Sequence, residues 1–96
     1  MVDDAVNYIL DLFSESYTDL LDRLPEKQRE VLIAIAKEGK AKGITGQVFI
    51  RKYHLQSPSA VIAAVRALLD KDFITQNNAT YSVYDPFFAL WLNINA

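Results

Sequence analysis

The chain has 96 residues, 51% of them apolar and 11% aromatic, which suffices for one hydrophobic core but not for a second independent domain. It has no cysteine and a single histidine, so a disulfide framework, a thiolate nucleophile and a zinc site built from cysteine and histidine are excluded. No apolar run is long enough to cross a membrane, and the acidic residues 1–4 are unlike a signal peptide, so we expect a cytoplasmic protein with no membrane partner.

The formal net charge of −2 is unevenly distributed along the chain. Residues 1–38 carry nine acidic and four basic side chains, whereas residues 39–96 carry six basic and three acidic ones. The net charges of the two parts are therefore −5 and +3. A surface that binds an anion is expected in the second part.

The first predicted element is an amphipathic helix behind two capping residues, Asp3 and Asp4. Its apolar residues recur at steps of three and four: Val6, Ile9, Leu10, Phe13, Tyr17, Leu20 and Leu21. A second helix should begin at Pro25, because proline suits a first helical turn and the acid that follows suits the positive end of the helix dipole. It should end at Gly39. Its buried residues are Val31, Leu32, Ile35 and Ala36.

Two further helices, separated by a turn, are predicted in the middle of the chain. The first is short, begins at Thr45 or Gly46 and extends through residues 47–53, with Phe49 and Tyr53 on one face. His54 follows where a helix ends, and a left-handed turn explains it better than a switch or a ligand does. Ser57 as the cap and proline as the first residue begin the next helix, which extends to about Lys71. Its inward stripe is Val61, Ile62, Val65, Leu68 and Leu69.

The sequence at the end of the chain predicts a β-hairpin followed by a terminal helix or turn. Two β-prone runs, residues 73–76 and 80–84, flank a pair of asparagines that tolerates the positive φ of a tight hairpin. Asp85 followed by proline repeats the start signal of a helix. The aromatic residues after it could offer stacking surfaces for bases, but their helical spacing favours packing in the core, with Trp91 on the same face as Phe87.

This order of elements predicts a fold that is mainly α-helical with a small β-hairpin. It is the order of a winged helix-turn-helix, with an extra N-terminal helix and a C-terminal aromatic helix. We divide the chain into an N-terminal linking helix, residues 1–22, and a winged-helix domain, residues 23–96.

Three segments carry the most specific sequence patterns: residues 24–32 (LPEKQREVL), 55–61 (LQSPSAV) and 81–92 (YSVYDPFFALWL). Together they resemble the C-terminal winged-helix region of archaeal-type AAA/STAND-like ATPases, a family also found in Bacteroides-type bacteria. The resemblance covers about residues 20–92. It implies that the chain is a C-terminal fragment of a larger protein that binds ATP and magnesium upstream.

The chain itself has no phosphate-binding loop, because residues 43–46 (GITG) lack the lysine and the spacing of that motif. Paired acids occur only at expected helix ends, with no base or nucleophile placed beside them. We therefore expect no enzymatic activity, catalytic residue, cofactor or metal in this fragment.

Nine residues are candidates for contact with nucleic acid or a partner protein: Lys40, Lys42, Arg51, Lys52, Ser57, Ser59, Ala63, Arg66 and Lys71. The cations and serines could contact phosphates or form an ordinary solvated surface. The expected outward residues of the helix that begins at Ser57 offer little to base edges: Ser59, Ala60, Ala63, Ala67 and Asp70. Only Arg66 could read guanine. The alanines allow close approach of another helix, although alanine also simply favours helices.

Two functions remain open from the sequence. The first is an accessory domain of an AAA-type ATPase, a docking or regulatory module with weak, nonspecific DNA binding. Its partner would be the parent ATPase core or another protein. The alternative is a free-standing winged-helix transcriptional regulator that dimerises through its first and last helices.

Overall fold

The computed structural model describes residues 2–96 and confirms the predicted fold class. The elements, in chain order, are α1 (Val2–Asp22), α2 (Glu26–Glu38), α3 (Gln47–Lys52), α4 (Pro58–Asp70), β1 (Ile74–Asn77), β2 (Thr80–Val83) and α5 (Pro86–Asn95). Helices α2, α3 and α4 followed by an antiparallel hairpin form a winged helix-turn-helix, and α1 and α5 are the extra helices. We call the β1–β2 hairpin the wing.

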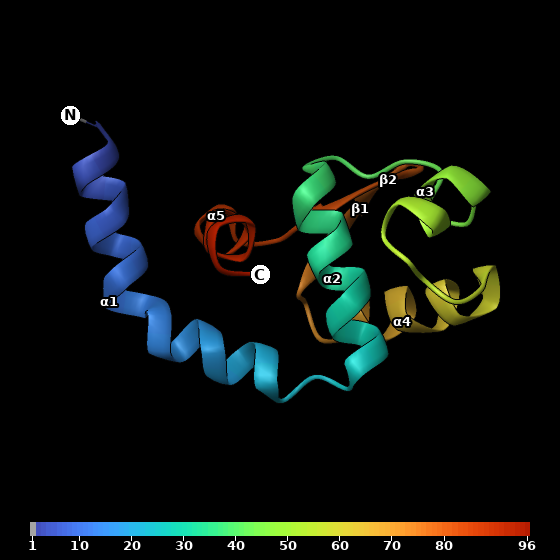
Figure 1. The fold of residues 1–96 in the computed structure, drawn as a ribbon, viewed down its shortest axis with the longest axis horizontal. Coiled ribbons are helices and arrows are strands. Elements are labelled where there is room, and N and C mark those ends of the chain that lie inside the picture. The colour runs from blue at the N-terminus through green and yellow to red at the C-terminus, as the bar shows by residue number, and fades with distance from the viewer. Residues whose placement is uncertain (1) are drawn as a thin grey trace.

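Helix α2 lies at the centre of the molecule and packs against α4, α5 and β2 (Figure 1). Helix α5 lies between α2 and α1, so that α1 and the α3–α4 pair lie at opposite ends (Figure 1). In the wing, Ile74 pairs with Val83 and Asn77 with Thr80. Asn78 follows with φ of 58°, the positive φ expected of an asparagine at the hairpin turn.

The core is formed where these helices meet. Its most deeply buried large side chains come from α2, α4 and α5: Leu32, Ile35, Val61, Leu68 and Leu92. All four residues of the stripe predicted for α2 are buried. Burial of several such side chains stabilises a fold by about 1.5–3 kcal/mol each. The winged helix is therefore centred on the α2–α4 contact.

Local start and stop signals explain most of the helix boundaries. The Ser57 hydroxyl accepts a hydrogen bond from the backbone N–H of Ala60, and proline is the first residue of α4. Asp85 likewise caps α5 by accepting from the N–H groups of Phe87 and Phe88. His54 adopts φ of 55°, which confirms its predicted role in a left-handed turn.

The aromatic cluster of α5 attaches α1 to the rest of the fold. The side chain of Trp91 is 6% exposed, and its ring lies 5.7 Å from that of Tyr17 in α1 and 6.1 Å from that of Phe88, between centroids. Its Nε1 donates a hydrogen bond to the Ser14 hydroxyl at 3.1 Å. Desolvation, and then the nearby Asp85 carboxylate, raise the pKa of Tyr17. The prediction that Trp91 is buried is confirmed.

Some predicted burial is wrong. Trp91 shares its buried face with Phe88, whereas Phe87 is 40% exposed, because α1 and α2 cover only one side of α5. Phe13, Leu20 and Leu90 are also exposed, since no further layer covers those sides of α1 and α5. Ile62 of α4 is 41% exposed.

The predicted caps of α1 are a second correction. Asp3 and Asp4 lie within the first turn of α1, because the helix already begins at Val2. An acidic residue in the first turn, such as Asp4, still interacts favourably with the helix dipole, so it is compatible with the longer helix.

Candidate nucleic-acid and partner interface

The exposed face of α4, the last helix of the helix-turn-helix, is poor in polar groups. The exposed residues of α4 are Pro58, Ser59, Ile62, Ala63, Arg66 and Asp70. Ala60 and Ala67, which were expected to point outward, are half-buried, and Ile62, which was expected in the core, points outward. The face therefore offers one cation and one acid.

A groove runs between α4 and the wing. Its apolar lining comes from Ile44, Ile62, Val65 and Leu69, and Arg66 supplies its positive charge. Asn78 and Ala79 at the tip of the wing form its far side. This groove was not predicted from the sequence, because its lining combines the edge of the α4 stripe with residues from two other segments.

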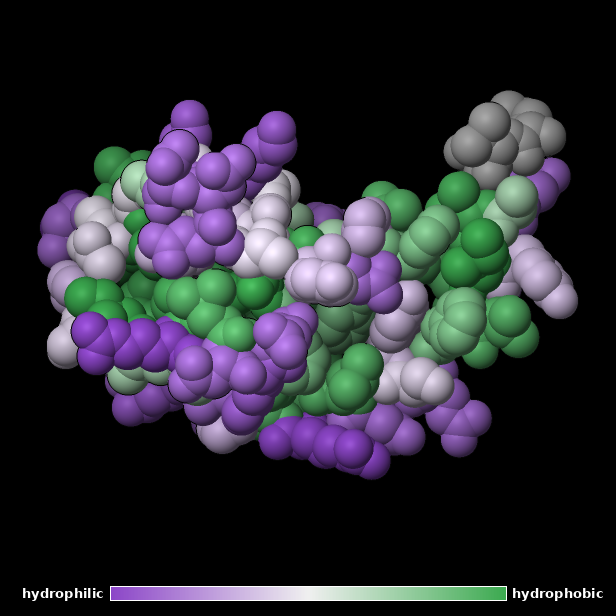
Figure 2. All heavy atoms as spheres, turned by 180° about the vertical axis from the view of Figure 1, so that it is seen from behind, coloured by the Kyte–Doolittle hydropathy of each residue, from purple (hydrophilic) through white to green (hydrophobic). Residues whose placement is uncertain are grey.

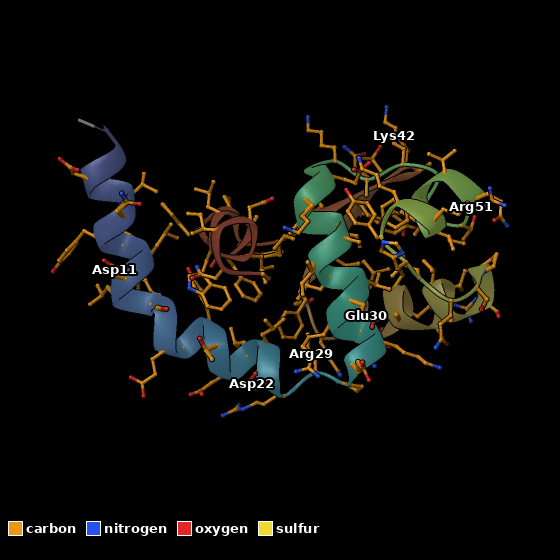
Figure 3. The ribbon with its side chains drawn as sticks, in the orientation of Figure 1. Asp11, Asp22, Arg29, Glu30, Lys42 and Arg51 are labelled. Atoms are coloured by element: carbon orange, nitrogen blue, oxygen red, sulfur yellow. The ribbon has the colours of Figure 1, made fainter. Side chains whose placement is uncertain are left out.

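Lys40 and Lys42 lie on the other side of the wing tip. They line a hollow that they share with Asn78 and Ala79. Between them, Ala41 is fully buried and pairs with Tyr81 of β2 through two backbone hydrogen bonds of 2.7 and 2.9 Å. Since neighbours of an inward residue in an extended segment point outward, this bridge directs both lysines to solvent. Lys42 extends away from the body in Figure 3.

Other candidate residues have structural contacts. Lys52 forms a salt bridge of 2.9 Å with Glu38, whose carboxylate also accepts a hydrogen bond from the Tyr53 hydroxyl. The hydrogen bond from Lys52, and then that from Tyr53, lower the pKa of Glu38, and Glu38 in turn raises the pKa of Lys52. Lys71 donates to the Gln28 side chain at 2.8 Å. With Ser57 used as a helix cap, these residues are less available to a ligand.

The remaining candidates do not gather into one patch. Arg51 lies on α3 and points away from the body, at the same end of the molecule as Lys42 (Figure 3), but it lines neither cavity beside the wing tip. Ser59 and Ala63 lie on α4, where Ala63 lines a second groove with Ala60 and the start of α2. The cations closest to forming a site are therefore Lys40, Lys42 and Arg66, on the two sides of the wing tip.

Comparison with known proteins decides the family. A family described as "probable winged helix domain" matches residues 15–94 of the chain. The chain belongs to this family. Searches of curated proteins and of solved structures gave no match. The match begins inside α1, and the division at residue 22 stays a prediction.

A winged-helix domain is typically a binding module, used with DNA or with proteins, rather than a catalyst. Among the side chains that the structure describes, residues 4–96, no group of three or more histidine, aspartate or glutamate residues could hold a metal ion. Within residues 2–96, none of the helices is both long and apolar enough to span a bilayer.

Proposed function

We propose that this winged-helix domain is an accessory docking or regulatory module at the C-terminal end of an AAA-type ATPase, with weak and nonspecific affinity for DNA. The resemblance of residues 24–32, 55–61 and 81–92 to such regions supports the ATPase parent. The parent would bind ATP and magnesium upstream, and this domain would supply no residue to that site.

The observation that carries the docking role is the exposed face of α4. Sequence readout in the major groove needs side chains that form bidentate hydrogen bonds with base edges, as arginine does with guanine and asparagine with adenine. Here Arg66 is the single such residue on the face, and Asp70 one turn later would repel phosphates. A lone arginine does not read a sequence.

The edge of the exposed α4 face that borders the start of α2 suits a protein partner. Ala60, Ala63 and Ala64 line a groove whose opposite wall is the start of α2, including Lys27 and Gln28. Small side chains let the backbone of a second helix approach closely, and alanine loses no rotamer entropy when it is buried. A helix of the parent ATPase or of another protein is the expected occupant.

The alternative function, a free-standing DNA-binding regulator, is favoured by the cations beside the wing. Lys40, Lys42 and Arg66 flank the wing tip, where they could neutralise phosphates. Few phosphate contacts give only weak binding at physiological salt. We therefore rank this function second.

The complete reading frame of the gene tests the ATPase parent. An upstream glycine-rich loop ending in Gly-Lys-Ser or Gly-Lys-Thr supports the proposal, because its backbone and lysine hold the phosphates of ATP. A frame that encodes these residues alone contradicts it and promotes the regulator.

The docking face is tested in the full-length protein. Ala63→Trp places a bulky group on the exposed groove of α4, and the ATPase rate should change while the melting temperature does not. Val48→Trp is the matched control, because Val48 is 83% exposed on α3. Equal ATPase rates in both variants and the unmodified protein would contradict docking through α4.

A further inference from the structure

Helix α1 carries two exposed apolar side chains on a side that no other described element covers. Leu10 and Tyr17 are buried towards α5, but Tyr8 and Leu12, one turn apart, are 68% and 62% exposed. Phe13 is also partly exposed, but it lies on another side of the helix, with its ring 6.0 Å from that of Tyr17. The first half of α1 forms an arm at one end of the molecule (Figure 1). Hydrophobic residues, drawn in green, cover much of this arm in Figure 2.

Acidic residues lie on the same side of α1 as Tyr8 and Leu12. Asp11, Glu15 and Asp19 follow Tyr8 and Leu12 at steps of three and four, which places all five on one side of the helix. No lysine or arginine occurs in α1. Two copies of this face packed together would bring like charges into contact, so its partner is a surface that is both apolar and basic.

The groove between α4 and the wing has these properties. Ile62 and Leu69 are part of its apolar lining, Arg66 supplies a positive charge, and Lys42 lies beyond the wing tip. The side chains along one side of a helix can enter this groove, because Ile62 in its lining is partly exposed to solvent. The apolar and charged groups of the groove therefore complement those of the arm.

The arm cannot reach the groove of its own chain. Asp11 on α1 lies at one end of the molecule and Lys42 and Arg51 lie towards the other (Figure 3), and the longest dimension of the fold is 40 Å. Since α1 is held on α5 by Tyr17, the partner groove must belong to another molecule.

We propose that the α1 arm of one molecule docks into the α4–wing groove of a second copy. The contact is head to tail, because each copy uses its arm for one neighbour and its groove for another. It joins an acidic and a basic surface, so salt should weaken it. It also covers Arg66, so self-association and DNA binding should compete. This inference does not depend on the ATPase parent.

Two variants test the two sides of the proposed contact, the α1 arm and the α4–wing groove, one at a time. The arm variant is Tyr8→Ser with Leu12→Ser, and the groove variant is Ile62→Ser with Arg66→Ser. All four positions are exposed, so both variants should keep the helicity of the unmodified chain in circular dichroism. If the arm variant loses helicity, Asp11→Asn with Glu15→Gln replaces it, because these changes remove only charge.

Analytical ultracentrifugation of the chain from micromolar to millimolar concentration provides the readout. The unmodified chain should grow in average mass with concentration, and each variant alone should stay monomeric. An equimolar mixture of the variants should form one-to-one dimers, because each retains the half that the other lacks. An unmodified chain that stays monomeric throughout, a mixture that stays monomeric, or a groove variant that still dimerises by itself would overturn the proposal.

Discussion

Replacing Trp91 by alanine should remove a large share of the stability of this domain. The ring packs against Tyr17 and Phe88, and its Nε1 is hydrogen-bonded to Ser14. Loss of a buried tryptophan costs about 3–5 kcal/mol, and a chain of this length has about 5–15 kcal/mol in total. Because 1 kcal/mol shifts the melting temperature of such a domain by about 4–8 °C, we expect Trp91→Ala to lower it by about 12–40 °C.

The assay is thermal and urea unfolding followed by far-ultraviolet circular dichroism. Phe87→Ala is the matched control on the same helix, because the Phe87 ring is partly exposed and its loss should cost less than half as much. A melting temperature for Trp91→Ala within about 3 °C of the unmodified chain, or equal to that of Phe87→Ala, would refute the packing argument.

Three further predictions concern a turn, a charge cluster and nucleotide binding. His54→Val should destabilise the fold by about 1–2 kcal/mol in urea unfolding, because a β-branched residue does not tolerate the left-handed φ, whereas His54→Gly should be accommodated. The hydrogen bonds from Lys52 and Tyr53 lower the pKa of Glu38 in the folded state. The stability that the Glu38 carboxylate contributes is therefore complete above its unfolded-state pKa of 4.5 and is lost as the pH falls through its folded-state pKa. Glu38→Gln should therefore lose less stability than the unmodified chain between about pH 6 and about pH 3, and equal losses would contradict this. In isothermal titration calorimetry the isolated chain should show no saturable binding of ATP in the micromolar range, because it lacks a phosphate-binding loop.

The fold was predictable where the signals are local. Ser57 and Asp85 hydrogen-bond to N–H groups two or three residues away, so the cap and the proline that follows it are adjacent in the sequence. The left-handed conformation of His54 likewise depends on its own position at the end of a helix. Burial at the edges of the apolar stripes was less predictable. Ile62 and Phe87 continue those stripes, but whether such a residue is covered depends on where the wing and α1 lie.

The candidate site was predicted only as a set of residue types. Lys52 and Glu38 are separated by 14 residues, and their ion pair depends on the angle between α2 and α3. The orientation of Lys40 and Lys42 depends on the backbone pairing of Ala41 with Tyr81, 40 positions later in the chain. No periodicity within one segment indicates such contacts, so sequence analysis could not separate the structural cations from those beside the wing.

Fluorescence anisotropy on unrelated DNA duplexes at two salt concentrations tests the central claim, that this winged-helix domain docks onto protein and does not read DNA sequence. With three or four phosphate contacts, the dissociation constants should be no tighter than about 10⁻⁵ M near physiological salt and similar for every duplex. Arg66→Ala should weaken this binding about equally on all of them, because the α4 face has no second base-reading side chain. Nanomolar binding to one duplex that persists in high salt, and that Arg66→Ala abolishes for that sequence alone, would contradict the claim.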